Sequence, residues 1–543
     1  MRNGLHADVI LRNGPIYTAY GQPYAEALAV RKGRVVAVGS ADSLDGLRGA
    51  ETAMIDLAGR MALPAFNDCH LHMIMLGRSL VEIKLGPTHV RSIPEAVEKI
   101  RQQAAATKPG EWIYGGRYDH FELAEKRHPT MAELDAAAPN NPVYIARCCG
   151  HVGVGNSRAF AAAGISGTTP DPEGGHIERR DGKLTGQLQE NAQKLVLKAM
   201  PALTLEEAVA AIEGASSHLL SFGVASVMDA GVGLNGRLLD MAAFQAARRS
   251  GRLPLRVYLA LLAGPDGILD ECYAAGLVTG AGDEFLKIGP AKLFADGSIG
   301  GHTAAMSLPY FNDRNNRGIF IYSDKEMQDL VADCMARGYQ VATHAIGDAA
   351  IEQVLLAYER AMAGGHSELR HRIEHCGFGT NEQMRRLRDA GILPIPQPCF
   401  ISHYGDVYAD AVGAERTGAS YPMRSWIENH MQPAASSDSP ICPPDTLANL
   451  ASMLTRKGPS GIIYGQDQTI DIERAIETMT YNGAYASHSE KYKGRLLPGQ
   501  AADIAILDRD ISALLPDEVS ATKVDATIVA GHIAFDRLGA CSG

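Results

Sequence analysis

The stretch Met61-Ala62-Leu63-Pro64-Ala65-Phe66-Asn67-Asp68-Cys69-His70-Leu71-His72 is the point around which the rest of the chain is organised. Its apolar first half, 61–66, predicts a short buried strand. His70 and His72 follow that strand two residues apart, so on extended backbone both imidazoles point the same way and can reach one ion. An isolated His-x-His is more often a pair of ordinary polar groups, and the metal-binding interpretation therefore depends on the rest of the chain.

The composition is that of a globular protein, with 543 residues and 46% apolar content, and it predicts one large catalytic domain with additions. The net charge of −11 comes without a basic stripe, which argues against a nucleic-acid partner. No uncharged stretch approaches the roughly 20 residues of a membrane span, and the start has no signal-peptide pattern. We therefore expect a soluble, cytoplasmic protein with no membrane partner, whose nine cysteines are reduced.

The two ends of the chain share a pattern of short apolar alternation interrupted by glycine turns, such as Asn13-Gly14 and Lys32-Gly33. The pattern returns at 501–508 and 526–531. Because neither half could bury its apolar face alone, residues 1–60 and 494–543 are predicted to form one composite β-sandwich. The catalytic domain, 61–493, would be inserted between them.

The middle of the chain alternates short apolar strands with helical stretches such as 205–222 and 324–338. Counting 61–66, there are eight strand candidates; the others are 224–229, 255–260, 291–294, 340–344, 372–375, 392–395 and 434–438. This alternation predicts an α/β fold, a (β/α)₈ TIM barrel with function at the carboxyl ends of its strands.

Residues 80–200 do not fit the alternation and are interpreted as an insertion after the first strand that covers the barrel mouth and contacts substrate. Trp112 and Tyr118 in this insertion, with Phe400 further on, are candidates for an aromatic substrate-binding wall. Aromatic residues at these spacings are also typical of a hydrophobic core, and the sequence leaves both interpretations open.

Several nitrogen and oxygen ligands fall at the predicted strand ends. These are His70, His72, Lys292, His344, His375 and Asp438. Each alone has an ordinary explanation, but together they predict a divalent metal site at one face of the barrel. Imidazole with carboxylate suits zinc best, and manganese, iron, cobalt and nickel remain alternatives.

The order of these motifs resembles the amidohydrolase superfamily, specifically the amidohydrolase 3 group that includes the N-substituted formamide deformylases. The matching stretches are 64–72, Lys292-Leu293-Phe294-Ala295-Asp296-Gly297-Ser298, Thr343-His344-Ala345-Ile346-Gly347-Asp348, Arg372-Ile373-Glu374-His375, Ser437-Asp438-Ser439-Pro440 and 494–503. The resemblance implies one or two metal ions on a (β/α)₈ barrel. His70, His72 and Asp438 would hold the more buried ion, His344 and His375 the second, and Lys292 would bridge both as a carbamate.

The carbamate has a physical reason beside the resemblance, because burial among cations lowers the pKa of a lysine and leaves an amine that can take up carbon dioxide. A Lys292 that pairs with Asp296 or with substrate is the alternative. Gly150-His151 through Asn156-Ser157 resembles another family stretch, so His151 could reach the substrate carbonyl or only stabilise a loop. His302 could act likewise, although the family more often has a different residue there.

The expected reaction is hydrolysis of a non-peptide carbon–nitrogen bond, amide or formamide in type, in a small substituted or aromatic metabolite, with Asp438 carrying the proton. The same site would also serve deamination, or hydrolysis of an ester or a carbon–carbon bond. A catalytically silent metal-binding protein is an alternative from another class, disfavoured by the complete ligand set. A small-molecule substrate is the expected partner, and homo-oligomer formation remains open.

Overall fold

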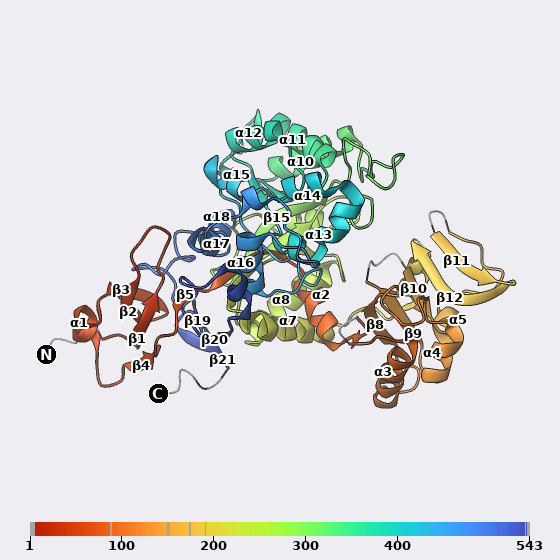
Figure 1. Cartoon of the computed structure of the whole chain (residues 1–543), viewed down its shortest axis with the longest axis horizontal. Coiled ribbons are helices and arrows are strands. Elements are labelled where there is room, and N and C mark those ends of the chain that lie inside the picture. The colour runs from red at the N-terminus through yellow and green to blue at the C-terminus, as the bar shows by residue number, and fades with distance from the viewer. Residues whose placement is uncertain are drawn as a thin grey trace. The chain divides into compact units, whose positions relative to one another are not determined.

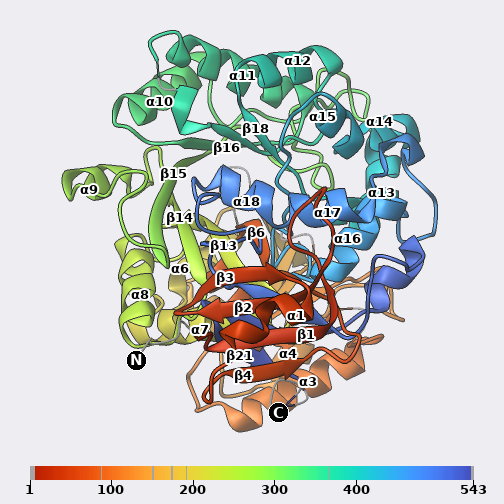
Figure 2. The same ribbon diagram turned by 90° about the vertical axis from the view of Figure 1, so that its left-hand side faces the viewer.

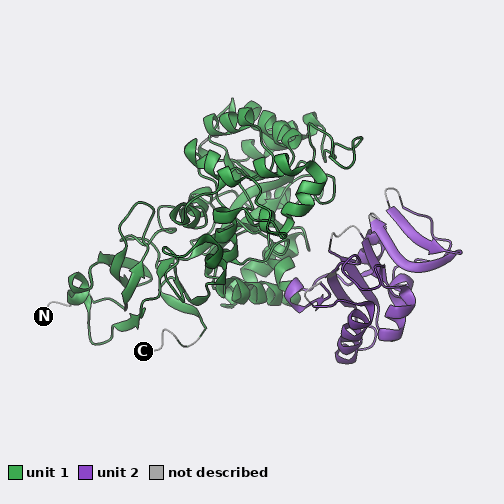
Figure 3. Cartoon of the chain, in the orientation of Figure 1, with its two compact units in different colours: residues 1–77, 205–543 green, residues 78–204 purple. Residues whose placement is uncertain are grey.

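The computed structural model describes residues 6–86, 89–148, 152–172, 175–190, 192–365, 367–537 and 539. The chain forms two compact units (Figure 3). Unit 1 combines residues 1–77 with 205–543, and unit 2 is Arg78–Thr204. The two units are described separately below.

The centre of unit 1 is a seven-stranded parallel sheet in the order β18-β17-β16-β15-β14-β13-β6 (Figures 1 and 2). Its strands are β6 (Phe66–Leu71), β13 (Val224–Val232), β14 (Arg256–Leu262), β15 (Leu286–Phe294), β16 (Val341–Ala345), β17 (Arg372–His375) and β18 (Leu393–Ile395). All nine residues of β13 are buried, as expected for a strand covered on both faces. The fold is therefore mixed α/β with a nearly barrel-shaped parallel sheet.

Two of the eight predicted barrel strands are wrong. The apolar run 61–66 does not form the first barrel strand, because Ala62–Pro64 is a separate strand, β5, of another sheet, and the barrel strand β6 begins at Phe66. Residues 434–438 form no strand, although they close the gap between β18 and β6. In that segment Ser436 N donates to Pro396 O at 3.0 Å and Asp438 N donates to His70 O at 2.8 Å.

Helices alternate with these strands along the chain and cover the sheet. They are α2 (Met73–Val81), α7 (Leu205–Leu220), α8 (Leu238–Arg249), α9 (Leu269–Ala274), α10 (Asp324–Ala336), α11 (Asp348–Met362) and α12 (Asn381–Asp389). The predicted helices at 205–222 and 324–338 are confirmed as α7 and α10. The sequence explains where α10 begins, because Ser323 and Glu326 form a reciprocal capping box at its start. Helices that follow β18 are α13 (Cys399–Val412), α14 (Ala414–Ala419), α15 (Met423–Glu428), α16 (Thr446–Thr455), α17 (Ile472–Thr478) and α18 (Tyr481–Ala486).

No helix of the described residues is both long and apolar enough to cross a membrane.

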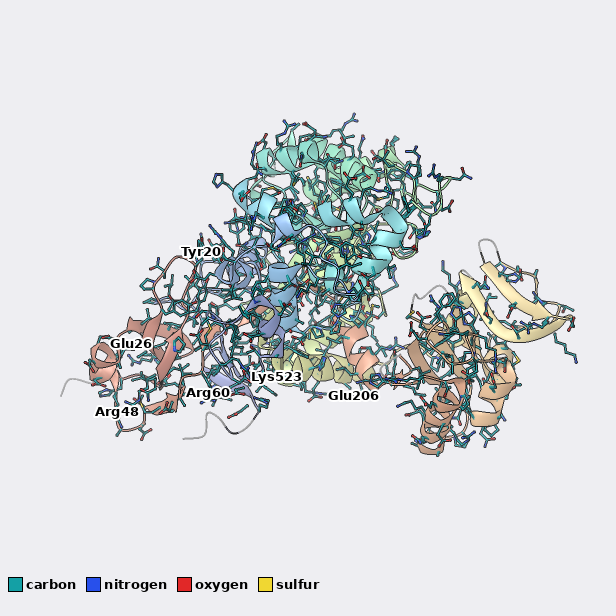
Figure 4. All side chains as sticks on the ribbon, in the orientation of Figure 1. Tyr20, Glu26, Arg48, Arg60, Glu206 and Lys523 are labelled. Carbon is teal, nitrogen blue, oxygen red and sulfur yellow. The ribbon has the colours of Figure 1, made fainter. Side chains whose placement is uncertain are left out.

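A second sheet in unit 1 draws its strands from both ends of the chain, in the order β21-β20-β19-β5-β1-β2-β3, with β4 paired to β1. Its strands are β1 (Val9–Ile16), β2 (Ala25–Arg31), β3 (Arg34–Gly39), β4 (Ala53–Asp56), β5, β19 (Ile504–Leu507), β20 (Val524–Val529) and β21 (His532–Asp536); the short helix α1 (Ala41–Leu44) follows β3. Leu28 and Ile55 from one end share a buried core with Ile504 and Ile528 from the other. Arg60, labelled in Figure 4, also joins the ends, since its Nη1 lies 3.5 Å from Asp525 Oδ2.

Unit 2 has its own six-stranded sheet, in the order β11-β12-β10-β9-β8-β7. Its elements are β7 (Ile83–Lys84), α3 (Ile93–Ala106), β8 (Ile113–Tyr118), α4 (Met131–Ala137), β9 (Val143–Arg147), β10 (Val152–Gly155), α5 (Ser157–Ala162), β11 (Gly175–Arg180), β12 (Lys183–Glu190) and α6 (Gln193–Ala199). Strands β7, β8 and β9 are parallel, and the others pair antiparallel. Two groups of buried apolar side chains give this unit cores of its own.

Candidate metal centre

Three side chains converge where β6 ends. His70 lies on the fully buried strand β6 and His72 directly follows it. The Nε2 atoms of His70 and His72 lie 3.5 and 3.4 Å from Asp438 Oδ1. These three residues each offer a ligand atom, and the atoms lie within 4.8 Å of one another. The set of two imidazoles and a carboxylate suits a divalent ion such as zinc.

The backbone holds Asp438 against the two histidines. Asp438 N donates to His70 O, and His72 N donates to Ser439 O at 2.8 Å, so the segment is joined to β6 on both sides of the aspartate. Asp438 has a φ of +57°, a left-handed conformation uncommon for a residue other than glycine. Burial works to raise the pKa of Asp438, but the hydrogen bond from His72 and the nearby His70 and Lys292 bring it below its ordinary value. A carboxylate in this position is therefore ionised at neutral pH.

His70 is oriented by Glu374, a residue to which the sequence analysis assigned no role. The Nδ1 atom of His70 is hydrogen-bonded to the Glu374 carboxylate, and Glu374 is fully buried. Arg372 donates to the same carboxylate, and its Nη2 also donates to Cys69 O at 2.7 Å. With Nδ1 engaged, Nε2 of His70 is the nitrogen that faces Asp438, as is usual where a carboxylate orients a metal-binding histidine. The signal in the sequence is the position of Glu374 in the motif Arg372-Ile373-Glu374-His375.

Two more predicted ligands lie beside His70. The ring of His375 lies 4.9 Å from that of His70, and the ring of His344 lies 4.4 Å from that of His375, centroid to centroid. Gln397 Oε1 lies 2.6 Å from His375 Nδ1, whereas His344 Nε2 lies 3.0 Å from Gly297 O. These contacts leave Nε2 of His375 and Nδ1 of His344 as the candidate ligand atoms. Burial places the pKa of both His70 and His375 well below the ordinary value, so these rings are neutral, the form that binds metals.

Lys292 is completely buried on β15, and its Nζ has no hydrogen-bond partner among the described residues. The ring of Phe294 lies 4.7 Å from Nζ. Burial lowers the pKa of Lys292 to about 8. Because a buried ammonium without a hydrogen bond is costly, this side chain fits a site that is completed by a further group.

Buried aspartates accept hydrogen bonds from backbone N–H groups next to these candidate ligands. Asp68 Oδ1 accepts from Ser437 N at 3.1 Å, next to Asp438. Asp229, on β13, accepts from Met73 N at 2.8 Å, next to His72. Burial raises the pKa of Asp68 and of Asp229 to about 6. Asp296 accepts from the backbone N–H groups of residues 305, 346 and 347. Asp68 and Asp229 were not predicted as site residues from the sequence; both lie inside barrel strands, on β6 and β13.

The other predicted site residues are more dispersed. Phe400 is buried on α13 with its ring stacked at 6.1 Å on that of His375, which places it beside the candidate metal ligands. His302 stacks on Tyr310 at 4.7 Å, and within the described chain no contact joins it to the histidines. In unit 2, Trp112 packs against one hydrophobic core, and the fully buried Tyr118 belongs to the other. His151 lies outside the described residues.

Comparison with known proteins gives the same assignment as the motifs. The model of the Amidohydrolase family matches residues 53–535. YtcJ of Bacillus subtilis (strain 168), named as an amidohydrolase, is 30% identical over 538 residues, covering 97% of this chain and 99% of its own length. The N-substituted formamide deformylase of Arthrobacter pascens is 26% identical over 526 residues, covering 95% and 96%.

A solved structure agrees over nearly the whole chain. The crystal structure of an uncharacterized metal-dependent hydrolase from Pyrococcus horikoshii OT3 superimposes with a TM-score of 0.78 at 29% identity, covering 94% of this chain and 99% of that one. The resemblance inferred from the motifs and the prediction of a hydrolase are both confirmed. The chain belongs to the amidohydrolase family.

Proposed function

We propose that the chain hydrolyses a carbon–nitrogen bond of the amide or formamide type in a small substituted or aromatic molecule, using a divalent metal. The observation that carries this proposal is the convergence of His70, His72 and Asp438, with Lys292 buried close by and, within the described parts of the chain, without a hydrogen-bond partner. The similarity to an N-substituted formamide deformylase supports the choice of bond.

The residues of the site fit a metal in number and in chemistry. His70, His72 and Asp438 would hold one ion, most suitably zinc, and His344 and His375 would hold a second. A bound divalent ion makes water a stronger acid and polarises a carbonyl. The neutral amine of Lys292 could add carbon dioxide to form a carbamate and release a proton, which would replace a neutral nitrogen by an anionic oxygen ligand for the metal.

Asp438 performs the proton transfer in this proposal. Its carboxylate is ionised and lies beside both imidazoles, so it can accept a proton from the attacking water and return it to the leaving nitrogen. Protonation of that nitrogen avoids the expulsion of an amide anion. Glu374 and Gln397 hold the rings of His70 and His375 in place.

The domain organisation is part of the same proposal. The sheet built from both termini supports a composite β-sandwich from 1–60 and 494–543, and the compact unit Arg78–Thr204 supports an inserted substrate-selecting subdomain after β6. A cytoplasmic location and a small-molecule substrate remain proposals.

The test is an activity screen of zinc-loaded enzyme over formamides, acyl amides, esters and cyclic imines. We expect turnover of formamides or acyl amides, and we expect His70→Ala and His72→Ala each to lose bound metal and nearly all activity. The matched control is His218→Ala, which replaces a histidine on α7. Hydrolysis confined to esters or cyclic imines would disprove the choice of bond, and full metal content in both variants would disprove the site.

A further inference from the structure

A second polar cluster lies in unit 2, at the carboxyl ends of two parallel strands. Tyr118 ends β8 and Arg147 ends β9, and the two residues are partners in the register of these strands. Asp119 and His120 follow Tyr118 directly. The carboxyl edge of a parallel sheet is a common place for ligand binding in α/β folds.

Two imidazoles stack in this cluster. The rings of His120 and His128 lie 4.1 Å apart between centroids, with 23° between their planes. The Nδ1 atom of each ring is already engaged, because Arg147 Nε donates to His120 Nδ1 at 3.0 Å and Tyr118 Oη lies 2.8 Å from His128 Nδ1. Arg147 Nη2 also donates to Asp119 Oδ1 at 2.9 Å.

These contacts determine the tautomer of His120. A guanidinium can only donate, so Nδ1 of His120 accepts, and the proton of the neutral ring must be on Nε2. Burial and then Arg147 lower the pKa of His120, while burial, His120 and Arg147 lower the pKa of His128 to about 4, so both rings are neutral at pH 7. In the part of the chain that the structure describes, neither Nε2 has a hydrogen-bond partner. His120 therefore presents an N–H donor, which suits an oxygen acceptor better than a metal ion.

An exposed aromatic ring borders the two imidazoles. Phe121 is 62% exposed, and its ring lies 3.9 Å from that of His120 between centroids. The guanidinium carbon of Arg147 lies 5.5 Å from the centre of the same ring. Apolar surface, an N–H donor and a guanidinium, itself paired with Asp119, thus occur together over a few ångströms.

We propose that His120, His128, Arg147 and Phe121 form a binding site for an aromatic carboxylate on unit 2. The carboxylate would accept a hydrogen bond from Nε2 of His120, with His128 and the guanidinium beside it, and the arene would pack against Phe121. This site goes beyond the proposed hydrolysis, because it shares no residue with the histidine and aspartate cluster and needs no metal.

Calorimetric titration of the full chain with benzoate tests the proposal. The decisive variant is His120→Asn, because the asparagine Oδ1 can replace Nδ1 as the acceptor for Arg147 while nothing replaces the Nε2 donor. We expect His120→Asn to weaken benzoate binding by about tenfold, as for the loss of a hydrogen bond to a charged group, and Phe121→Ala to weaken it as well. The matched control is His176→Asn, which alters the exposed histidine paired with Asp171 in the same unit.

Two further measurements separate this site from the metal centre and define the ligand. Benzoate binding should persist in the chain carrying both His70→Ala and His72→Ala, so failure of the proposed hydrolysis would not affect the result. Benzamide, which has the same ring without the charge, should bind at least about tenfold more weakly. Absence of benzoate binding, equal binding by His120→Asn in a chain of unchanged melting temperature, or equal binding of benzamide would each overturn the proposal.

Discussion

His70 and Glu374 are 304 residues apart in the sequence, and the Nδ1 atom of the histidine is hydrogen-bonded to the glutamate carboxylate inside the barrel. Arg372 balances the charge of that carboxylate, and both Arg372 and Glu374 are completely buried. The pair explains how one nitrogen of His70 is directed toward Asp438. A metal ion held by His70 would therefore depend on Glu374, a residue that need not touch the ion.

Substitution of Glu374 should therefore weaken metal binding. Glu374→Gln keeps the size of the side chain but removes the charge that orients His70, and loss of such an outer partner typically costs about 10- to 100-fold in metal affinity. Equilibrium dialysis with zinc measures this. Glu359→Gln, which removes a surface partner of Arg386, is the control and should leave affinity unchanged. Unaltered affinity in Glu374→Gln would show that Glu374 only packs against its neighbours.

Asp438→Asn should separate proton transfer from metal binding. The amide keeps an oxygen toward the imidazoles but cannot accept and return a proton at neutral pH. We expect kcat to fall by about 10²- to 10⁴-fold while most of the metal remains bound. The control is Asp471→Asn, which replaces a helix-capping aspartate with an equally good cap and should change neither kcat nor metal content. A near-normal rate in Asp438→Asn would assign the proton transfer to another group.

Lys292 should carry a carbamate when the site is filled. Zinc-loaded enzyme supplied with ¹³C-bicarbonate should give a carbamate signal by NMR, and Lys292→Ala should lose activity and regain part of it with an added short carboxylate such as formate or acetate. Lys287→Arg is the control, since Nζ of Lys287 donates to Ser487 O at 2.6 Å and is already partnered. An unmodified Lys292 amine in fully active, metal-loaded enzyme would contradict the carbamate.

Acid should destabilise unit 2 partly through Glu133. The hydrogen bond from Arg127 is the main cause that lowers the pKa of Glu133 to about 2, from 4.5. Because the unfolded chain binds the proton more readily between these values, this contribution to stability is present above pH 4.5 and is lost as the pH falls toward 2. Glu133→Gln should therefore flatten the loss of unfolding free energy between about pH 5 and pH 3, measured by urea unfolding. Glu122→Gln, at an exposed glutamate of the same unit, is the control. Its unfolding free energy should fall with decreasing pH as steeply as that of the unsubstituted chain.

Much of the architecture follows from local patterns. The period of apolar residues predicted six of the barrel strands and the helices α7 and α10, because a buried strand or an amphipathic helix imposes its repeat on a short segment. The positions of His70, His344 and His375 at strand ends also follow locally, since a strand end is marked by the end of its apolar run. These positions were sufficient to identify the family.

The apolar run at 61–66 shows where local pattern is insufficient. Its pattern predicts one strand, but Ala65 N donates to Asp503 O, just before β19, and Phe66 N donates to Gly223 O, just before β13. Adjacent residues therefore bond to segments that lead into different sheets. The segment at 434–438 is similar, because its backbone bonds alternate among Pro394, Thr478 and Pro396 before reaching His70. The repeat of apolar residues cannot reveal such changes of hydrogen-bond partner, because the partners lie far away in the sequence.

The sequence by itself determined the family, the parallel α/β core and the ligand types available at the strand ends, because these depend on the order and spacing of residues along the chain. The tertiary structure alone decided that His70, His72 and Asp438 lie together, that Glu374 orients His70, and that the buried Lys292 amine has no hydrogen-bond partner among the residues that the structure describes. The reason is physical: hydrogen bonds and burial join residues through space, and Glu374 and Asp438 reach His70 only when the sheet curves back on itself and the segment 434–438 closes it.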